Sequence, residues 1–379
     1  ETLNIFVQKL INRIVFLRIC EDRELEKYES LKNIGTYAEL KKVFTVADKK
    51  YDSGLFELID GEQFEISDSI LMHIFKELYY PNSCYEFSIV DPFIIGQIYE
   101  LFLEEEIVIK DGIVVAERKP EIVDSQGVVN TPKNIADIIV KTTLTPLFSD
   151  EKFTEWDSYR IADICCGSGN FLLSAYEFII NRYIEYYMKN CLDMAIQKGL
   201  LISDVGNNFK LSYEKKREIL QNNIWGVDID MESFVKNNNC RILPSLDNNI
   251  KNGNSLVDEK YIEFNSNILN NPEMVEKIKI FNWENEFEGE KFDAIVGNPP
   301  YIRVQNMVHF SENEYEYYKS EVSKYETAKS DLLDKYFLFM EKGLQLLKPK
   351  GKMGYIIPHK FMLIKSGASL RKLLSEKKC

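Results

Sequence analysis

Short apolar runs separated by longer helical segments are the feature that most restricts how this 379-residue chain can fold. The runs are residues 161–165 (IADIC), 224–229 (IWGVDI), 292–296 (FDAIV) and 351–358 (GKMGYIIP). Strands that are continuously apolar are buried on both faces, which is typical of parallel sheets covered by helices. Helical patterns from about Asn170 and through Leu332–Leu347 supply the crossovers that parallel strands need. We therefore predict a parallel α/β sheet with both faces covered.

The N-terminal part has a different pattern, because its apolar residues recur three and four positions apart. This spacing predicts amphipathic helices over residues 3–19, 68–79 and 91–105. The last of these begins with an Asp-Pro pair at Asp91, a typical helix start.

The helical pattern gives way to short β-branched runs in residues 106–120 (EIVIKDGIVVAERKP). These runs flank Asp111-Gly112, which indicates a hairpin and a domain boundary. We predict a helical domain over residues 1–115 and an α/β domain over residues 116–379.

The cysteine pattern and the first residue narrow the class of protein. Of the seven cysteines only Cys165 and Cys166 lie close together and no CxxC pair occurs, so neither a zinc site nor a disulfide framework is indicated. No apolar run approaches the length of about 18 residues or more that a membrane span needs. We expect a soluble protein of a reducing cytoplasm. The chain begins with Glu1 rather than Met, which suggests a fragment of a longer protein.

The net charge of −13 argues against extensive contact of the whole chain with nucleic acid. The charge is unevenly distributed, however, because the segment from Lys342 to Cys379 has ten Lys and Arg residues against a single acidic residue, Glu376. Either a surface that faces phosphate groups or an ordinary solvated face explains this basic segment.

A glycine-rich turn follows the first apolar run, in residues 162–173 (ADICCGSGNFLL). Gly167 and Gly169 would let backbone N–H groups approach a ligand at the carboxyl edge of the sheet. A tight strand-to-helix turn without a ligand is the alternative. Asp228 ends the next run, where a carboxylate is placed to accept hydrogen bonds from ribose hydroxyls, although alone it could be a surface carboxylate. Together the two features predict a nucleoside ligand.

The third run is followed by Gly297 and then by Asn298, Pro299, Pro300 and Tyr301 (NPPY). A planar amino group is a poor nucleophile because its lone pair is delocalised. The Asn298 side-chain oxygen and the Pro299 carbonyl could accept both of its hydrogens and stabilise the charge that develops on attack. The two prolines fix the backbone, and Tyr301 offers a ring on which a flat substrate stacks. The alternative is an ordinary Pro-Pro turn at a strand end.

With CGSG, VDID, GNSL and GNPPY in this order, the chain resembles the N6-adenine DNA methyltransferases, specifically those of type IIG restriction-modification proteins. The resemblance implies a Rossmann-like sheet that binds S-adenosylmethionine, and no metal. It implies that the catalytic residues are Asn298, Pro299, Pro300 and Tyr301. It implies that the cofactor-binding residues are Thr131, Pro132, Asp163, Gly167, Gly169, Phe171, Asp228, Ile229, Asn254, Ser255 and Leu256.

The resemblance also assigns parts of the cofactor to these positions. Thr131 and Pro132 would cover it, Asp163 and the two glycines would meet its methionine half, and Asp228 would bind its ribose. Ile229 would contact one face of the adenine, and the amide oxygen of Asn254 would accept a hydrogen bond from the adenine amino group.

As a whole, the resemblance implies transfer of a methyl group to N6 of an adenine flipped out of double-stranded DNA. Residues 1–115 are then the helical connector, and the target-recognition and nuclease domains are expected elsewhere in the full-length chain. Methylation of a protein glutamine amide or of an RNA base amine is an alternative with the same motif. A non-catalytic module of the same fold is another.

Overall fold

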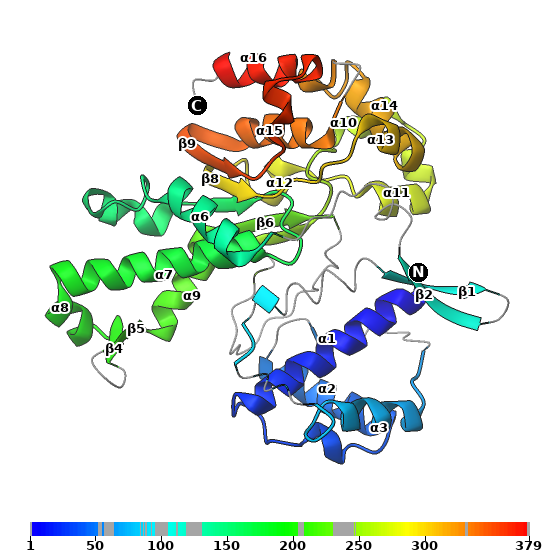
Figure 1. The fold of residues 1–379 in the computed structure, drawn as a ribbon, viewed down its shortest axis with the longest axis vertical. Helices are drawn as coiled ribbons and strands as arrows, with labels where there is room; N and C mark the ends of the chain where they lie inside the picture. The colour runs from blue at the N-terminus through cyan, green and yellow to red at the C-terminus, as the bar shows by residue number, and fades with distance from the viewer. Residues whose placement is uncertain are drawn as a thin grey trace. The chain divides into compact units, whose positions relative to one another are not determined.

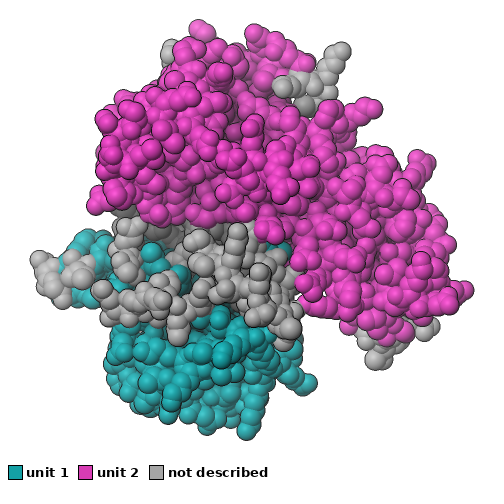
Figure 2. Space-filling view, turned by 180° about the vertical axis from the view of Figure 1, so that it is seen from behind, with its two compact units in different colours: residues 1–119, 234–247 teal, residues 120–233, 248–379 magenta. Residues whose placement is uncertain are grey.

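The computed structural model describes residues 2–51, 55–56, 64–83, 85, 87, 89–91, 93–94, 105–110, 113–118, 131–203, 208–229, 246, 248–329 and 333–376. The chain divides into two compact units, residues 1–119 with 234–247, and residues 120–233 with 248–379 (Figure 2). None of the helices in the described part is long and apolar enough to cross a membrane.

The first unit is built from α1 (Thr2–Asp22), α2 (Tyr37–Tyr51) and α3 (Asp68–Glu77). Their apolar stripes form one buried cluster, which includes Phe6, Leu10, Ile14, Leu17, Leu40, Phe44, Leu71 and Phe75. The predicted helices at residues 3–19 and 68–79 are confirmed. Of the third, Phe93 and Ile94 are helical and the Asp91 carboxylate accepts the Phe93 N–H at 2.9 Å, whereas most of the segment lies outside the described residues.

The predicted hairpin is also present in this unit. β1 (Glu105–Lys110) pairs antiparallel with β2 (Ile113–Arg118), and Lys110 lies opposite Ile113. The turn residues Asp111 and Gly112 lie outside the described residues. The first change of compact unit along the chain falls between residues 119 and 120, and residues 234–247 belong to the first unit again. The predicted domain bounds and the roles assigned to the two domains stay predictions.

The second unit contains a five-stranded sheet in the order β7-β6-β3-β8-β9, in which each pairing is parallel. Figure 1 labels β6, β8 and β9 of this sheet. The strands are β3 (Ile161–Asp163), β6 (Ile224–Asp228), β7 (Ile250–Asn252), β8 (Phe292–Gly297) and β9 (Leu347–Tyr355). The four apolar runs are thus strands of one Rossmann-like parallel sheet, as predicted. The sequence did not indicate β7, because this strand has three half-buried residues and only one of them is apolar.

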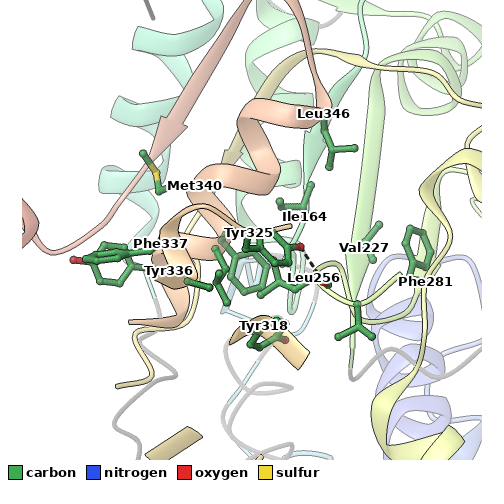
Figure 3. Close-up of a cluster of buried hydrophobic side chains, with 14 of the residues drawn as sticks. Ile164, Val227, Leu256, Phe281, Tyr318, Tyr325, Tyr336, Phe337, Met340 and Leu346 are labelled. Atoms are coloured by element: carbon green, nitrogen blue, oxygen red, sulfur yellow. Dashed lines mark hydrogen bonds between the residues drawn. The ribbon is translucent and has the colours of Figure 1, made fainter. Parts of the chain in front are cut away.

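Helices cover both faces of the sheet, and successive residues of β8 show this directly. Ala294 and Val296 belong to a buried cluster with α6 (Lys133–Leu144), α7 (Asn170–Asn190) and α9 (Tyr213–Asn223). Ile295 belongs to a second cluster with α15 (Lys335–Leu346), part of which is shown in Figure 3. Because neighbouring residues of a strand point to opposite faces, this split explains why the strand is continuously apolar.

The remaining elements connect or flank these layers. The helices are α8 (Leu192–Gln197), α10 (Lys260–Phe264), α11 (Pro272–Ile278), α12 (Trp283–Glu286), α13 (Val304–Phe310), α14 (Glu312–Lys319) and α16 (Ala368–Glu376). The antiparallel strands β4 (Leu201–Ser203) and β5 (Phe209–Leu211) lie within the long insertion between β3 and β6. Short 3-10 helices occupy Leu31–Asn33, Asp150–Ser158, Ile268–Asn270, Thr327–Lys329, His359–Met362 and Lys365–Gly367.

Candidate functional site

The glycine-rich turn leads from β3 into α7 through two residues with left-handed backbone conformations. Gly167 has φ +51° and Gly169 has φ +83°. The Gly169 N–H donates to the Cys166 carbonyl at 2.7 Å, which closes the turn. A Cβ atom on Gly169 would meet no atom of the described residues within 4 Å, so the left-handed backbone conformation is the feature that calls for glycine here.

Hydrogen bonds join the carboxyl ends of β3, β6 and β7. The Gly167 N–H donates to Asp228 Oδ2 at 2.7 Å, and the Gly253 N–H donates to the Asp228 carbonyl at 2.9 Å. The Ser255 hydroxyl donates to the Ile164 carbonyl at 2.5 Å. The glycine-rich turn, Asp228 and the residues after β7 are therefore brought together at one edge of the sheet, where open α/β folds bind ligands.

Asp163 is the last residue of β3 and is 1% exposed. Its carboxylate accepts the Cys165 N–H at 3.0 Å, and a Cβ atom on Gly297 would come within 2.6 Å of Asp163 Oδ1. Burial, with a smaller contribution from the Asp228 charge, raises the pKa of Asp163 to about 7. The carboxyl group packs against Gly297, the residue before Asn298, and its contact with the methionine half of a cofactor stays a prediction.

The Asn298 carboxamide is held on two sides directly after β8. Its Nδ2 donates to Thr131 Oγ1 at 3.0 Å, a contact between residues 167 positions apart in the chain. The Tyr301 hydroxyl lies 2.5 Å from Asn298 Oδ1 and 2.7 Å from the Ile356 carbonyl. Burial raises the pKa of Tyr301 to about 12, so its hydroxyl keeps one proton for these two acceptors. The Tyr301 ring meets Tyr336 edge to face, with the ring centroids 6.0 Å apart.

Thr131 thus contacts Asn298, a predicted catalytic residue, whereas the family resemblance implied that Thr131 covers the cofactor. Thr131 is 5% exposed and immediately precedes Pro132, the N-cap residue of α6. No local sequence pattern links Thr131 to Asn298, because the contact is made by the packing of α6 against the sheet.

The loop after β7 carries Asn254, Ser255 and Leu256, which are 3%, 4% and 1% exposed. Asn254 Oδ1 accepts the Leu256 N–H at 3.1 Å, and Asn254 Nδ2 donates to Glu314 Oε2 at 3.3 Å. The Leu256 carbonyl accepts the Tyr325 hydroxyl at 2.8 Å, and both residues are labelled in Figure 3. Glu314 was not predicted from the sequence, since a glutamate in a polar segment gives no signal of burial.

The other predicted residues lie close to these in the chain, with different surroundings. Ile229 directly follows β6, and Phe171, in the first turn of α7, is 4% exposed within the buried cluster on one face of the sheet. Pro299 is buried and Pro300 is half-buried. Their roles in binding or catalysis stay predictions.

The basic C-terminal segment is not a uniformly exposed surface. Lys342 is 9% exposed, and burial lowers its pKa. Lys348 pairs with Asp293 at 2.8 Å, and Arg371 donates to the carbonyls of Phe361 and Ile364 at 2.5 and 2.8 Å. Part of this charge therefore has structural partners within the fold.

With this geometry established, the chain can be compared with known proteins. Residues 222–379 match the Eco57I restriction-modification methylase family. The match covers β6 to α16, including Asp228, Asn254 and the NPPY segment. The predicted resemblance to restriction-modification methyltransferases is confirmed at this level.

Two curated relatives are similar to this chain in sequence. The type II restriction enzyme and methyltransferase RM.Eco57I of Escherichia coli is 38% identical over 404 residues, covering 100% of this chain and 38% of that protein. The type II methyltransferase M.HincII of Haemophilus influenzae is 27% identical over 146 residues, covering 37% of this chain and 28% of that protein. The chain thus spans less than half the length of these curated relatives.

The structure is similar to that of the type IIL restriction-modification enzyme MmeI, solved in complex with DNA. The TM-score is 0.58 at 13% sequence identity, and the match covers 100% of this chain and 50% of that chain. At this identity the likeness shows the fold, which agrees with the parallel sheet and its covering helices.

Proposed function

We propose that this chain is the methyltransferase core of a restriction-modification protein, and that it transfers a methyl group from S-adenosylmethionine to N6 of adenine in double-stranded DNA. The observation that carries the proposal is the Asn298 carboxamide at the end of β8, which Thr131 and Tyr301 hold beside the strand ends that would bind a nucleoside. The Eco57I-family match over residues 222–379 supports the same reaction class.

The residues at the sheet edge fit S-adenosylmethionine. A Cβ atom on Gly169 would meet none of the described atoms within 4 Å, and the Asp228 carboxylate accepts the Gly167 N–H of the same turn. In the proposed arrangement Asp228 binds the ribose, Ile229 and Asn254 contact the adenine, and the turn approaches the methionine half. When bound, the cofactor supplies an electrophilic methyl group.

Asn298 and Pro299 prepare the amine that accepts this methyl group. Asn298 Oδ1 and the Pro299 carbonyl would accept the two N–H bonds of the adenine amino group, which localises the nitrogen lone pair and stabilises positive charge as it develops. The Tyr301 proton can then be donated wholly to the Ile356 carbonyl, at 2.7 Å, which leaves Asn298 Oδ1 available to the substrate. As the N6–methyl bond forms, the bond from the methyl group to sulfur breaks, and the cationic nitrogen then releases one proton to solvent. The attack itself therefore needs no ionised base.

The target base must leave the DNA helix to reach this site, because N6 is paired within the duplex. Flipping costs a few kcal/mol of stacking and pairing, and in our proposal the ring of Tyr301 offers a replacement surface for stacking. Double-stranded DNA is the proposed partner of the full-length protein, with target-recognition and nuclease domains outside this chain. The proposed location is the cytoplasm.

The proposal is tested by incubating the full-length protein with plasmid DNA and labelled S-adenosylmethionine, and by identifying the methylated nucleoside by mass spectrometry. We expect N6-methyladenine with the wild type. We expect its loss in Asn298→Ala, with S-adenosylmethionine affinity kept within about threefold, because Asn298 acts on the amine and not on the cofactor. Asn270→Ala, at an exposed position, is the matched control. Label in cytosine, RNA or protein, or unchanged adenine methylation by Asn298→Ala, would overturn the assignment.

A further inference from the structure

The orientation of the Asn254 carboxamide is set by both of its neighbours. Oδ1 faces the Leu256 N–H at 3.1 Å, and Nδ2 faces Glu314 Oε2 at 3.3 Å. If the amide were reversed, its NH2 group would face another donor and its oxygen would face a carboxylate. Asn254 is 3% exposed, so water does not relieve either conflict. The two contacts therefore favour one orientation of the amide, in which Oδ1 faces the Leu256 N–H and Nδ2 faces Glu314.

Glu314 can only accept hydrogen bonds while it is ionised, and its surroundings keep it so. It is 6% exposed, Lys335 Nζ lies 3.1 Å from Oε2, and the Tyr318 hydroxyl donates to the same oxygen at 2.6 Å. Burial opposes ionisation, but the Lys335 charge and these hydrogen bonds leave the pKa of Glu314 below its ordinary value. Glu314 is therefore a carboxylate at neutral pH.

The same ion pair is tied to the chain that follows the NPPY segment. The Lys335 N–H donates to the Ile302 carbonyl at 2.8 Å, and Ile302 directly follows Tyr301. The loop carrying Asn254, the carboxylate of α14 and the first residue of α15 thus form one connected network. Side chains held in this way lose little freedom when a ligand binds, which favours a fixed recognition geometry.

We propose that Glu314, paired with Lys335, is a positioning residue that fixes the Asn254 carboxamide with its oxygen available to the 6-amino group of the cofactor adenine. This inference rests on the proposed function. It assigns Glu314 the task of making residue 254 an acceptor, and it explains why an amide stands there. An aspartate at position 254 would place a second carboxylate beside Glu314, and two carboxylates that share a buried site cannot both ionise readily.

The first test compares two ligands by calorimetry with the 379-residue chain: S-adenosylhomocysteine, and S-inosylhomocysteine, whose 6-oxo group is an acceptor. We expect the wild type to prefer the adenosine compound. Glu314→Gln presents either a donor or an acceptor to Asn254, so this preference should fall by about tenfold, the effect of losing a hydrogen bond to a charged group. Glu316→Gln, at an exposed position of the same helix, should keep the preference.

A merely structural role for Glu314 would weaken both ligands equally and leave the preference unchanged, which would overturn the proposal. A second set of variants does not depend on the folding of Glu314→Gln alone. Asn254→Asp should bind S-adenosylhomocysteine about tenfold more weakly because of the adjacent carboxylate, and Asn254→Asp with Glu314→Gln should recover most of that loss. Wild-type-like binding by Asn254→Asp, or no recovery in the double variant, would contradict it. If the wild type binds neither ligand, the proposed function fails and this inference fails with it.

Discussion

Thr131→Val removes the hydrogen-bond acceptor of Asn298 Nδ2 while nearly keeping the side-chain volume. In the wild type this bond is 3.0 Å long and joins a buried Thr131 to the half-buried Asn298. Removing a hydrogen bond of this kind costs about 0.5–1.5 kcal/mol. The carboxamide can avoid this cost by rotating, and rotation moves Oδ1 away from the position where it would accept the adenine amino group.

If the cost of restoring the productive orientation of the carboxamide appears in the transition state, kcat should fall by about 2- to 10-fold. The assay is steady-state methyl transfer by the full-length protein to DNA, with S-adenosylmethionine affinity measured separately by calorimetry. We expect that affinity to stay within about threefold. Thr131→Ser keeps the acceptor and should restore most of kcat, and Thr142→Val, on the exposed side of α6, is the matched control.

The result that would refute this reasoning is an unchanged kcat together with a clear loss of S-adenosylmethionine affinity in Thr131→Val. Thr131 would then act on the cofactor, as its position in the sequence motif suggested, and its hydrogen bond to Asn298 would have no part in positioning the amide.

Two further predictions concern Asp163 and its contact with Gly297. Because burial raises the pKa of Asp163 to about 7, the unfolded chain releases this proton at lower pH than the folded protein, so this carboxyl makes folding less favourable as pH rises from about 4 to 7. The free energy of unfolding of Asp163→Asn, relative to that of the wild type, should therefore be higher at pH 8 than at pH 5 when both are measured by urea denaturation. An equal difference between the two proteins at both pH values would contradict the raised pKa. Gly297 has φ +155°, and Gly297→Ala would place a Cβ atom 2.6 Å from Asp163 Oδ1. This variant should lower the free energy of unfolding by about 1–3 kcal/mol. Gly289 has φ +69°, and a Cβ atom there would meet none of the described atoms within 4 Å, so Gly289→Ala measures the cost of a positive φ without a steric contact. Equal losses of unfolding free energy in the two variants would show that the contact with Asp163 is unimportant.

The sequence predicted β3, β6 and β8 because burial of most of their residues leaves a local mark. The runs identified in the sequence overlap these strands, and they overlap the edge strand β9 over residues 351–355, where the residues are half-buried or exposed. The other edge strand, β7, has only one apolar residue among its three half-buried residues. Its place beside β6 follows from pairing with a neighbour and not from its own composition. The hairpin of β1 and β2 was predictable for the same local reason, since its turn signal and its two strands are consecutive.

The chemistry of the candidate site divides in the same way. NPPY is four consecutive residues, so its amide, rigid backbone and ring can be recognised in the sequence alone. The partners that orient the amides cannot be: Thr131 lies 167 positions from Asn298, and Glu314 lies 60 positions from Asn254. A hydrogen bond needs its two atoms within about 3 Å, and only the packing of α6 and α14 in the tertiary structure brings these side chains so close.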